Sequence, residues 1–286
     1  MLTLFVADPG FSQTVKNNRP LSGEERLVAD IELSAVDLTL KSHPGAILYE
    51  YQYPAQKPIK ISAEYRAAAN SPHHHTCFLR LHNKNCEVSK KQKMVGWSLF
   101  DSSEDEDDMT PMTLTLTDSI PVDLNLTVCS SKSTLDFSGI MLSMLNLNIG
   151  AGQTLVRFAR PNPVRLKTMQ VSTGASQLKM TGLGRANFDV LQFSGGATDV
   201  VIDFDGTINR EVKVNISLDA GSMKMFIPKG LGVKINHSSG FFSNITLPSD
   251  FYQKGSYYLS SNSGTSKGIL NISVASTAGA VTLEWK

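Results

Sequence analysis

The sequence is poor in cysteine, in charge and in long apolar runs. Its 286 residues include three cysteines, Cys77, Cys86 and Cys129, too few for the disulfide framework of a small secreted domain. No uncharged apolar run approaches the roughly 18 residues that a membrane-spanning helix needs. We therefore expect no transmembrane segment in this chain. A chain of this length can bury a core without disulfides or a structural metal, so we also expect no cofactor.

Charged side chains are scarce and balanced in sign. They make up 19% of the residues, with 27 basic and 26 acidic side chains and a formal net charge of +1. Nucleic-acid-binding domains cluster Lys and Arg, and here the longest such run is the pair Lys90 and Lys91. The sequence therefore predicts no nucleic-acid partner. Ser, Thr, Asn and Gly are frequent in place of charged residues. From this composition we expect an extracytoplasmic protein that is periplasmic, secreted or at the cell surface.

The strongest positive feature is an internal repeat. Four segments share a pattern of alternating apolar residues, a small turn and a second alternating run: LNLNIGAGQTLVRF, MQVSTGASQLKM, LQFSGGATDVVIDF and VNISLDAGSMKMFI. Their turn alanines, Ala151, Ala175, Ala197 and Ala220, are 24, 22 and 23 residues apart. Alternation with a period of two indicates strands with one buried face. The coil period is therefore about 23 residues.

A coil of this length cannot bury its own apolar face, so successive coils must share a core. We predict an all-β fold, a single-stranded stacked β-solenoid like a β-helix, with an irregular β cap region at its N-terminal side. Upstream, IELSAVDLTL (31–40) has the same apolar spacing and is expected to pair as an outlying rung. Trp285 is expected to close the far end. The glycines Gly150, Gly174, Gly196 and Gly221 are interpreted as structural turns, where the chain reverses with positive φ.

Three regions follow along the chain. Residues 1–16 are expected to be a flexible leader or the remnant of a signal peptide, because the apolar run from Leu2 to Ala7 lacks the basic start of a complete secretory signal. Residues 17–118 are predicted to form the N-terminal β region, with variable loops at 72–88 and 101–110. Residues 119–286 are predicted to form the repetitive solenoid.

The repeat resembles a known bacterial family. PVDLNLTV, LDFSGIMLSMLNLNIGAGQTLVRF, GLGRANFDVLQFSGGATDVVIDFDG and VNISLDAGSMKMFIPKGLGV are similar to the toastrack, or LiaF-like C-terminal, β-solenoid domains, which are related to predicted bacterial adhesins. ADIELSAVDLTLKS and MVGWSLF resemble the start of the same domain. The resemblance implies a solenoid on the outer side of a membrane. Members that signal envelope stress carry membrane helices before this domain, so this chain resembles a secreted or periplasmic version.

One loop concentrates metal-binding side chains. His73, His75, Cys77, His82 and Cys86 lie within 14 residues, and imidazole and thiolate ligate zinc or copper. Their spacing matches no standard zinc finger, and adjacent residues of a strand point to opposite faces. A polar insertion with a disulfide between Cys77 and Cys86 is the alternative interpretation.

Carboxylates suggest two further sites. The run from Glu104 to Asp108 could hold calcium, but it lacks the spacing of a calcium loop and is interpreted as a solvated loop. Asp203 and Asp205 are expected to share the wet face of a strand, where a carbohydrate-active enzyme places its two carboxylates. Such pairs also occur on ordinary half-exposed strands.

The sequence contains no recognisable catalytic signature. It predicts a non-enzymatic β-solenoid at the cell envelope that acts as an interaction or adhesin-like module with a protein or glycan partner. A metal-binding protein that uses the loop from His73 to Cys86, and a carbohydrate-active β-helix enzyme, are the alternatives.

Overall fold

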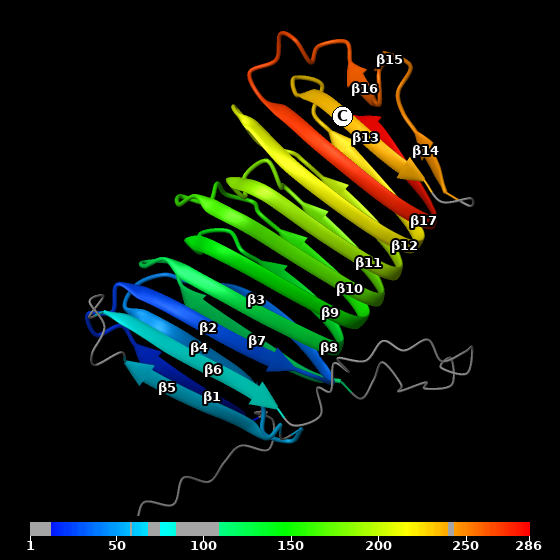
Figure 1. Cartoon of the computed structure of the whole chain (residues 1–286). Coiled ribbons are helices and arrows are strands. Elements are labelled where there is room, and N and C mark those ends of the chain that lie inside the picture. The colour runs from blue at the N-terminus through cyan, green and yellow to red at the C-terminus, as the bar shows by residue number, and fades with distance from the viewer. Residues whose placement is uncertain (1–12, 58, 68–74, 84–108, 240–242) are drawn as a thin grey trace, which may run out of the picture.

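The computed structural model describes residues 13–57, 59–67, 75–83, 109–239 and 243–286, and its strands form one sheet in a long stack (Figure 1). This part of the chain contains no helix. Accordingly, the described residues include no helix with the length and apolarity that a membrane crossing needs. The all-β solenoid predicted from the repeat is confirmed.

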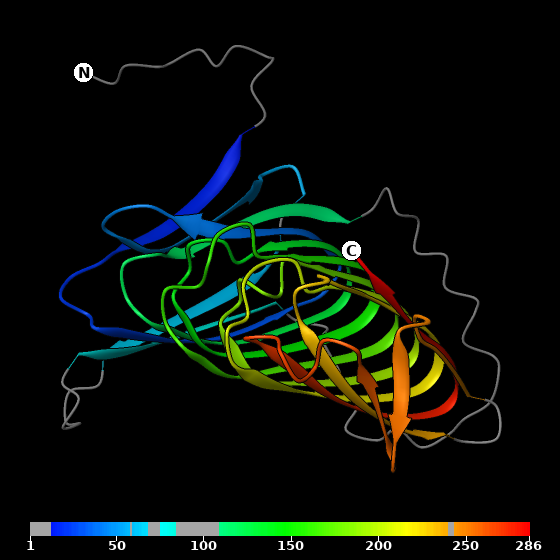
Figure 2. The ribbon, with the colours of Figure 1, turned by 90° about the horizontal axis from the view of Figure 1, so that it is seen from above.

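Five long parallel strands form the centre of the stack. They are β8 (Val122–Asp136), β9 (Leu142–Arg157), β10 (Leu166–Thr181), β11 (Phe188–Asp203) and β12 (Glu211–Ile227). Each strand pairs in register with the next and bends near its middle, so that the bent strands lie one behind another when viewed from above (Figure 2). We call the residues before each bend the first arm and those after it the second arm.

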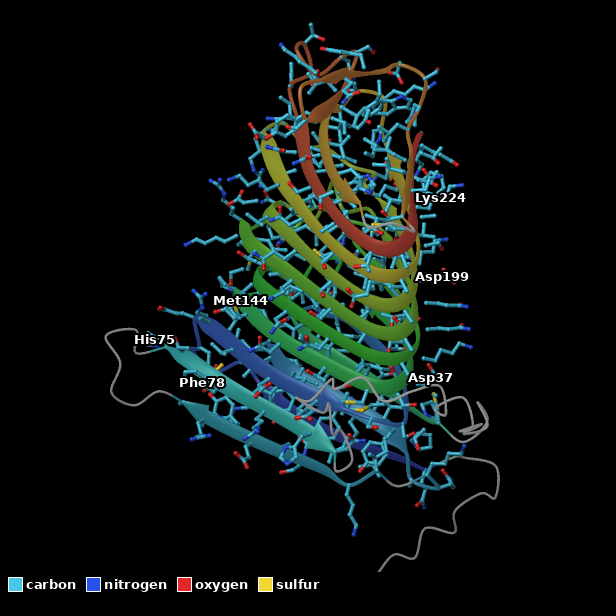
Figure 3. All side chains as sticks on the ribbon, turned by 45° about the vertical axis from the view of Figure 1, so that its right-hand side comes forward. Asp37, His75, Phe78, Met144, Asp199 and Lys224 are labelled. Carbon is cyan, nitrogen blue, oxygen red and sulfur yellow. The ribbon has the colours of Figure 1, made fainter. Side chains whose placement is uncertain are left out.

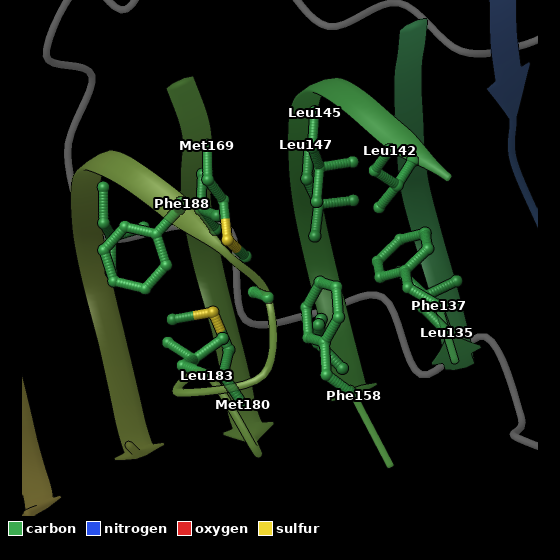
Figure 4. Packing of buried hydrophobic residues seen from close by; sticks show 14 of the residues in the cluster. Leu135, Phe137, Leu142, Leu145, Leu147, Phe158, Met169, Met180, Leu183 and Phe188 are labelled. Carbon is green, nitrogen blue, oxygen red and sulfur yellow. The ribbon is translucent and has the colours of Figure 1, made fainter. Parts of the chain in front are cut away.

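Buried and exposed side chains alternate along each arm, and the buried ones form the core. In β10, Met169, Val171, Leu178 and Met180 point inward and are buried, while Lys179 between them is exposed. Because the register is kept from rung to rung, like residues stack into columns between the two arms (Figure 4). The loops after β8 and β9 add Phe137 and Phe158, whose rings lie 5.5 Å apart. One apolar core therefore runs through the stack.

The N-terminal end is built from shorter strands that join into rungs. β2 (Arg26–Leu33) pairs with the first arm of β8, and β3 (Val36–His43) with its second arm. The outlying rung expected from residues 31–40 is thus confirmed. β6 (Thr76–Asn83) and β7 (Thr110–Thr117) form the next rung outward. The antiparallel strands β1 (Thr14–Pro20), β4 (Ile47–Pro54) and β5 (Ile61–Ala67) cover that rung.

At the other end the last strand lies inside the stack. β17 (Ile269–Trp285) pairs with β12 on one side and with β13 (Gly232–Ser239) and β14 (Asn244–Thr246) on the other. The short strands β15 (Phe251–Lys254) and β16 (Tyr257–Ser260) extend this edge. β14 covers only part of the second arm of β17. Trp285 lies beyond it, with its ring 5.6 Å from Phe251 and its Nε1 donating to Asp250 at 2.7 Å, and so helps to close this end.

The corner glycines differ from their predicted role. Gly150, Gly174, Gly196 and Gly221 all lie within long strands, because the chain bends there without reversing. Of these four, only Gly221 has a positive φ, of 109°. Gly150 and Gly174 are needed for close approach between rungs. A Cβ on Gly174, for example, would lie 2.6 Å from the carbonyl oxygen of Gly150 on the rung below.

Candidate functional site

The described members of the predicted metal site do not converge. Cys77 and His82 lie on β6, but Cys77 is buried in the core while His82 belongs to the opposite face. The five-residue separation puts them on opposite sides of the strand because side chains alternate. His75 precedes β6 and lies 4.0 Å from Glu25. His73 and Cys86 lie outside the described residues, as does the run from Glu104 to Asp108.

The cysteines also depart from the predicted pairing. Cys77 is a free, buried cysteine, so the possible bridge to Cys86 that the sequence left open is not formed. Burial raises the pKa of its thiol to about 12, and its sulfur donates to the backbone oxygen of Arg26 at 3.4 Å. Cys129, at the corner of β8, is disulfide-bonded. Cys77 is therefore a core residue, and the disulfide belongs to the corner of the stack.

Thiol titration should distinguish these two states. A disulfide uses two cysteines, so with Cys77 free we expect one reactive thiol per chain after unfolding without reductant. In the native protein the buried Cys77 should not react, because the thiolate is the nucleophile and its pKa is raised. Ellman's reagent measures both numbers, and the reduced, unfolded chain with three thiols is the control. Three thiols before reduction would rule out the disulfide.

The carboxylates considered for an enzyme are held by cations. β11 ends at Asp203, and Asp205 lies just beyond it, with the buried Phe204 between the two and the Asp205 backbone N–H donating to Oδ1 of Asp203 at 2.9 Å. Asp203 accepts a hydrogen bond from Nζ of Lys286 at 2.8 Å, and Asp205 accepts one from Arg185 at 2.9 Å. The hydrogen bond from Arg185 keeps the pKa of the Asp205 carboxyl below its usual value. One ion pair joins the end of β11 to Lys286, and the other joins the segments that follow β10 and β11.

A groove runs along the outer face of the second arms. Two depressions of about 600 and 540 Å³ adjoin there and share four lining residues, Lys132, Gln153, Gln177 and Asp199. Small corner residues such as Ala175 and Ala197 form the low side of the groove, beside these longer side chains. Asp37 lies at one end, and Figure 3 shows it on the same side of the stack as Asp199 and Lys224. We call this surface the second-arm groove.

The side chains of the groove are aligned by the strand register. The first column consists of one residue from each rung from β8 to β12: Lys132, Gln153, Gln177, Asp199 and Ser222. The second column lies two residues further along each strand: Thr134, Leu155, Lys179, Val201 and Lys224. Since neighbouring strands lie about 4.8 Å apart, these columns extend over roughly 19 Å.

Few of these side chains are committed to partners. Asp199 accepts a hydrogen bond from Ser222 Oγ at 2.6 Å, and Lys224 pairs with Glu284 at 2.8 Å. Within the described part of the chain, Lys132 and Lys179 form no ion pair. Free lysine ammonium groups and amide side chains in a shallow groove can donate hydrogen bonds to a ligand.

Sequence reasoning missed this groove, although a signal for it was present. When the repeats are aligned on their turn alanines, the residues two positions later are Gln153, Gln177, Asp199 and Ser222. The residues four positions after the alanines belong to the second column. The turn alanines and the glycines mark the period of the repeat, whereas the outward positions that follow them carry the candidate ligand contacts.

Comparison with protein families shows to which family this chain belongs. The model of the N-terminal domain of toast_rack, DUF2154, matches residues 9–167, which is more than half of the chain. The chain belongs to the toast-rack family. The match covers the N-terminal rungs and continues through β8 and β9. The family predicted from the repeat motifs is therefore confirmed for this toast-rack chain.

Solved structures with similar shapes include two from bacteria. A predicted cell adhesion protein from Clostridium sporogenes matches with a TM-score of 0.49 and 17% identity, covering 96% of this chain and 100% of that one. A predicted adhesin from Bacteroides fragilis matches with a TM-score of 0.36 and 11% identity, covering 96% of this chain and 98% of that one. A comparison with curated proteins gives no match.

Proposed function

We propose that this toast-rack chain is a non-enzymatic binding module that acts outside the cytoplasm, at the cell envelope, and holds an extended partner along its second-arm groove. The observation that carries the proposal is the register of the groove. Outward side chains from five consecutive rungs form two straight columns. Repeat proteins use extended surfaces of this kind for binding. A partner with its own linear repeat would meet the same spacing on every rung.

Two further observations support the location and the class of protein. Disulfides form and persist in oxidising compartments outside the cytoplasm, and Cys129 is disulfide-bonded. Asp203 and Asp205, the carboxylates considered for glycoside cleavage, are each bound to a cation. The groove offers lysine, amide and hydroxyl groups that suit binding.

Co-sedimentation with bacterial envelope material tests this function. We expect the purified chain to sediment with the insoluble cell-wall and membrane fraction. The double substitution Ala175→Leu and Ala197→Leu fills the low side of the groove and should abolish sedimentation. The matched control, Ser194→Leu and Ser217→Leu, places the same side chains on exposed positions of the first arms and should sediment like the wild type. If the wild type stays in solution, or both variants behave alike, the proposal is wrong.

A further inference from the structure

The cations of the second-arm groove lie on alternate rungs. Lys132 belongs to β8, Lys179 to β10 and Lys224 to β12. Two strand spacings separate successive lysines, or about 9.5 Å along the stack. Lys132 and Lys179 are exposed, and Lys224 lies 5.0 Å from the ring of Phe226 as well as beside Glu284. An anionic partner would therefore meet a lysine at every second rung, with Asp37 on β3 directly beside Lys132 at the end of the groove.

The intervening rungs place apolar side chains in the same groove. Leu155 on β9 pairs with Lys179, and Val201 on β11 pairs with both Lys179 and Lys224. Both apolar side chains are half-buried on the outer face. From β9 to β12 the second column thus alternates between a small apolar surface and a cation, whereas on β8 it carries Thr134 and the cation, Lys132, lies in the first column. A sugar ring has a matching character, because its C–H face is apolar and its edge carries hydroxyl groups.

Beyond Lys132, the first column supplies hydrogen-bonding groups beside that alternation. Gln153 and Gln177 carry amides that both donate and accept, and their strands pair directly. Asp199 on β11 carries a negative charge and can accept hydrogen bonds from sugar hydroxyls. Its charge would repel an acidic group bound at its own rung. The groove is therefore arranged for acidic groups at β8, β10 and β12, and for neutral, hydroxyl-bearing units at β9 and β11.

We infer that the ligand of the second-arm groove is an acidic linear glycan that lies along the stack and carries an acidic group on about every second sugar. An extended glycan advances roughly one strand spacing per sugar unit, so such a chain would present its acidic groups to the lysines in register. This inference rests on the proposed binding function and specifies its ligand. It assigns Lys132 and Lys179 to the acidic groups, Leu155 and Val201 to sugar faces, and Gln153, Gln177 and Asp199 to hydroxyls.

Glycan binding by the full chain tests the inference. Calorimetry or biolayer interferometry would compare three probes: hyaluronate oligosaccharides, with a carboxylate on every second sugar; polygalacturonate oligosaccharides, with one on every sugar; and neutral dextran. We expect hyaluronate to bind more tightly than polygalacturonate, and dextran not to bind. Added salt should weaken binding, because exposed charges are screened.

Charge-matched variants locate the site. The double substitution Lys132→Gln and Lys179→Gln should raise the Kd for hyaluronate at least about tenfold. The control, Lys167→Gln and Lys213→Gln, removes the same charge from exposed positions of the first arms and should leave the Kd within about twofold. Equal losses in both variants would show non-specific attraction and overturn the assignment, as would equal binding of dextran.

Two outcomes separate this inference from the proposed function. Envelope sedimentation that depends on the groove, without binding of any acidic glycan, would leave the binding function in place and overturn the ligand class. Competition by a poly-glutamate peptide as strong as that by hyaluronate would identify an acidic peptide partner and reject the glycan. Failure of both sedimentation and glycan binding would overturn the two together.

Discussion

Replacing Phe158 with alanine should lower the free energy of unfolding by about 3–5 kcal/mol, the range observed when buried aromatic side chains are truncated. Phe158 follows β9 and is 1% exposed. Its ring lies against Phe137 of the previous rung (Figure 4). Its backbone nitrogen donates to Thr181 on the next rung at 3.0 Å, which fixes the loop around the ring and limits how far the cavity can collapse. The loss should therefore fall in the upper part of the range for large-to-small substitutions.

The matched control is Phe78→Ala. Phe78 is on the outer face of β6 and is 45% exposed, so the same truncation leaves no cavity and should cost less than about 1 kcal/mol. The midpoint of unfolding in urea, followed by circular dichroism, measures both changes. Phe158→Ala would contradict the packing described here if it shifted the midpoint no more than Phe78→Ala did.

Replacing Gly152 with alanine should destabilise the chain by about 2–5 kcal/mol, because it adds backbone strain to a steric overlap. Gly152 has a φ of 116°, in the region that side-chain-bearing residues rarely adopt. It also lies at the corner of β9, where a Cβ would overlap the backbone carbonyl oxygen of Ser131 on the rung below. Neither Gly152 nor Ser131 can move without disturbing the register between β8 and β9.

Gly230→Ala provides the comparison for this substitution. Gly230 lies in the loop after β12, and a Cβ there would meet no atom within 4 Å. Its φ is not positive. The change should therefore alter the free energy of unfolding by less than about 1 kcal/mol. Thermal and urea unfolding of the two variants measure the difference. A Gly152→Ala protein as stable as Gly230→Ala would show that the corner of β9 is not constrained in this way.

The corner also shows how far local sequence can define a bend. The repeat places small residues at every corner, as the structure confirms. At the equivalent position, however, β9 uses Gly152 with a positive φ, whereas β10 and β11 use Ser176 and Thr198, with the Thr198 hydroxyl donating to the backbone oxygen of Ser176 at 2.7 Å. At Gly152 the carbonyl oxygen of Ser131 on the rung below leaves no room for a Cβ. That contact joins residues about 22 apart in the chain, so single-repeat patterns do not contain it.

The cysteine and histidine cluster illustrates a different error. Closeness in sequence suggested that Cys77 and His82 could act together, although the parity of their separation already places them on opposite faces of a strand. The boundaries of β6 were needed to apply that rule. The disulfide at Cys129 was beyond prediction from spacing, because disulfide connectivity depends on which cysteines the fold brings together.

The sequence by itself determined the all-β class, the coil period and the buried face of each long strand, because alternation and the spacing of small residues are local properties of the chain. Only the tertiary structure decided that β17 lies between β12 and β13, and that β2 and β3 lie inside the rung of β6 and β7. These pairings join segments far apart in sequence, and several arrangements would bury the same apolar faces. The groove combines both levels: each rung contributes its outward residues locally, and the register between rungs aligns them into columns.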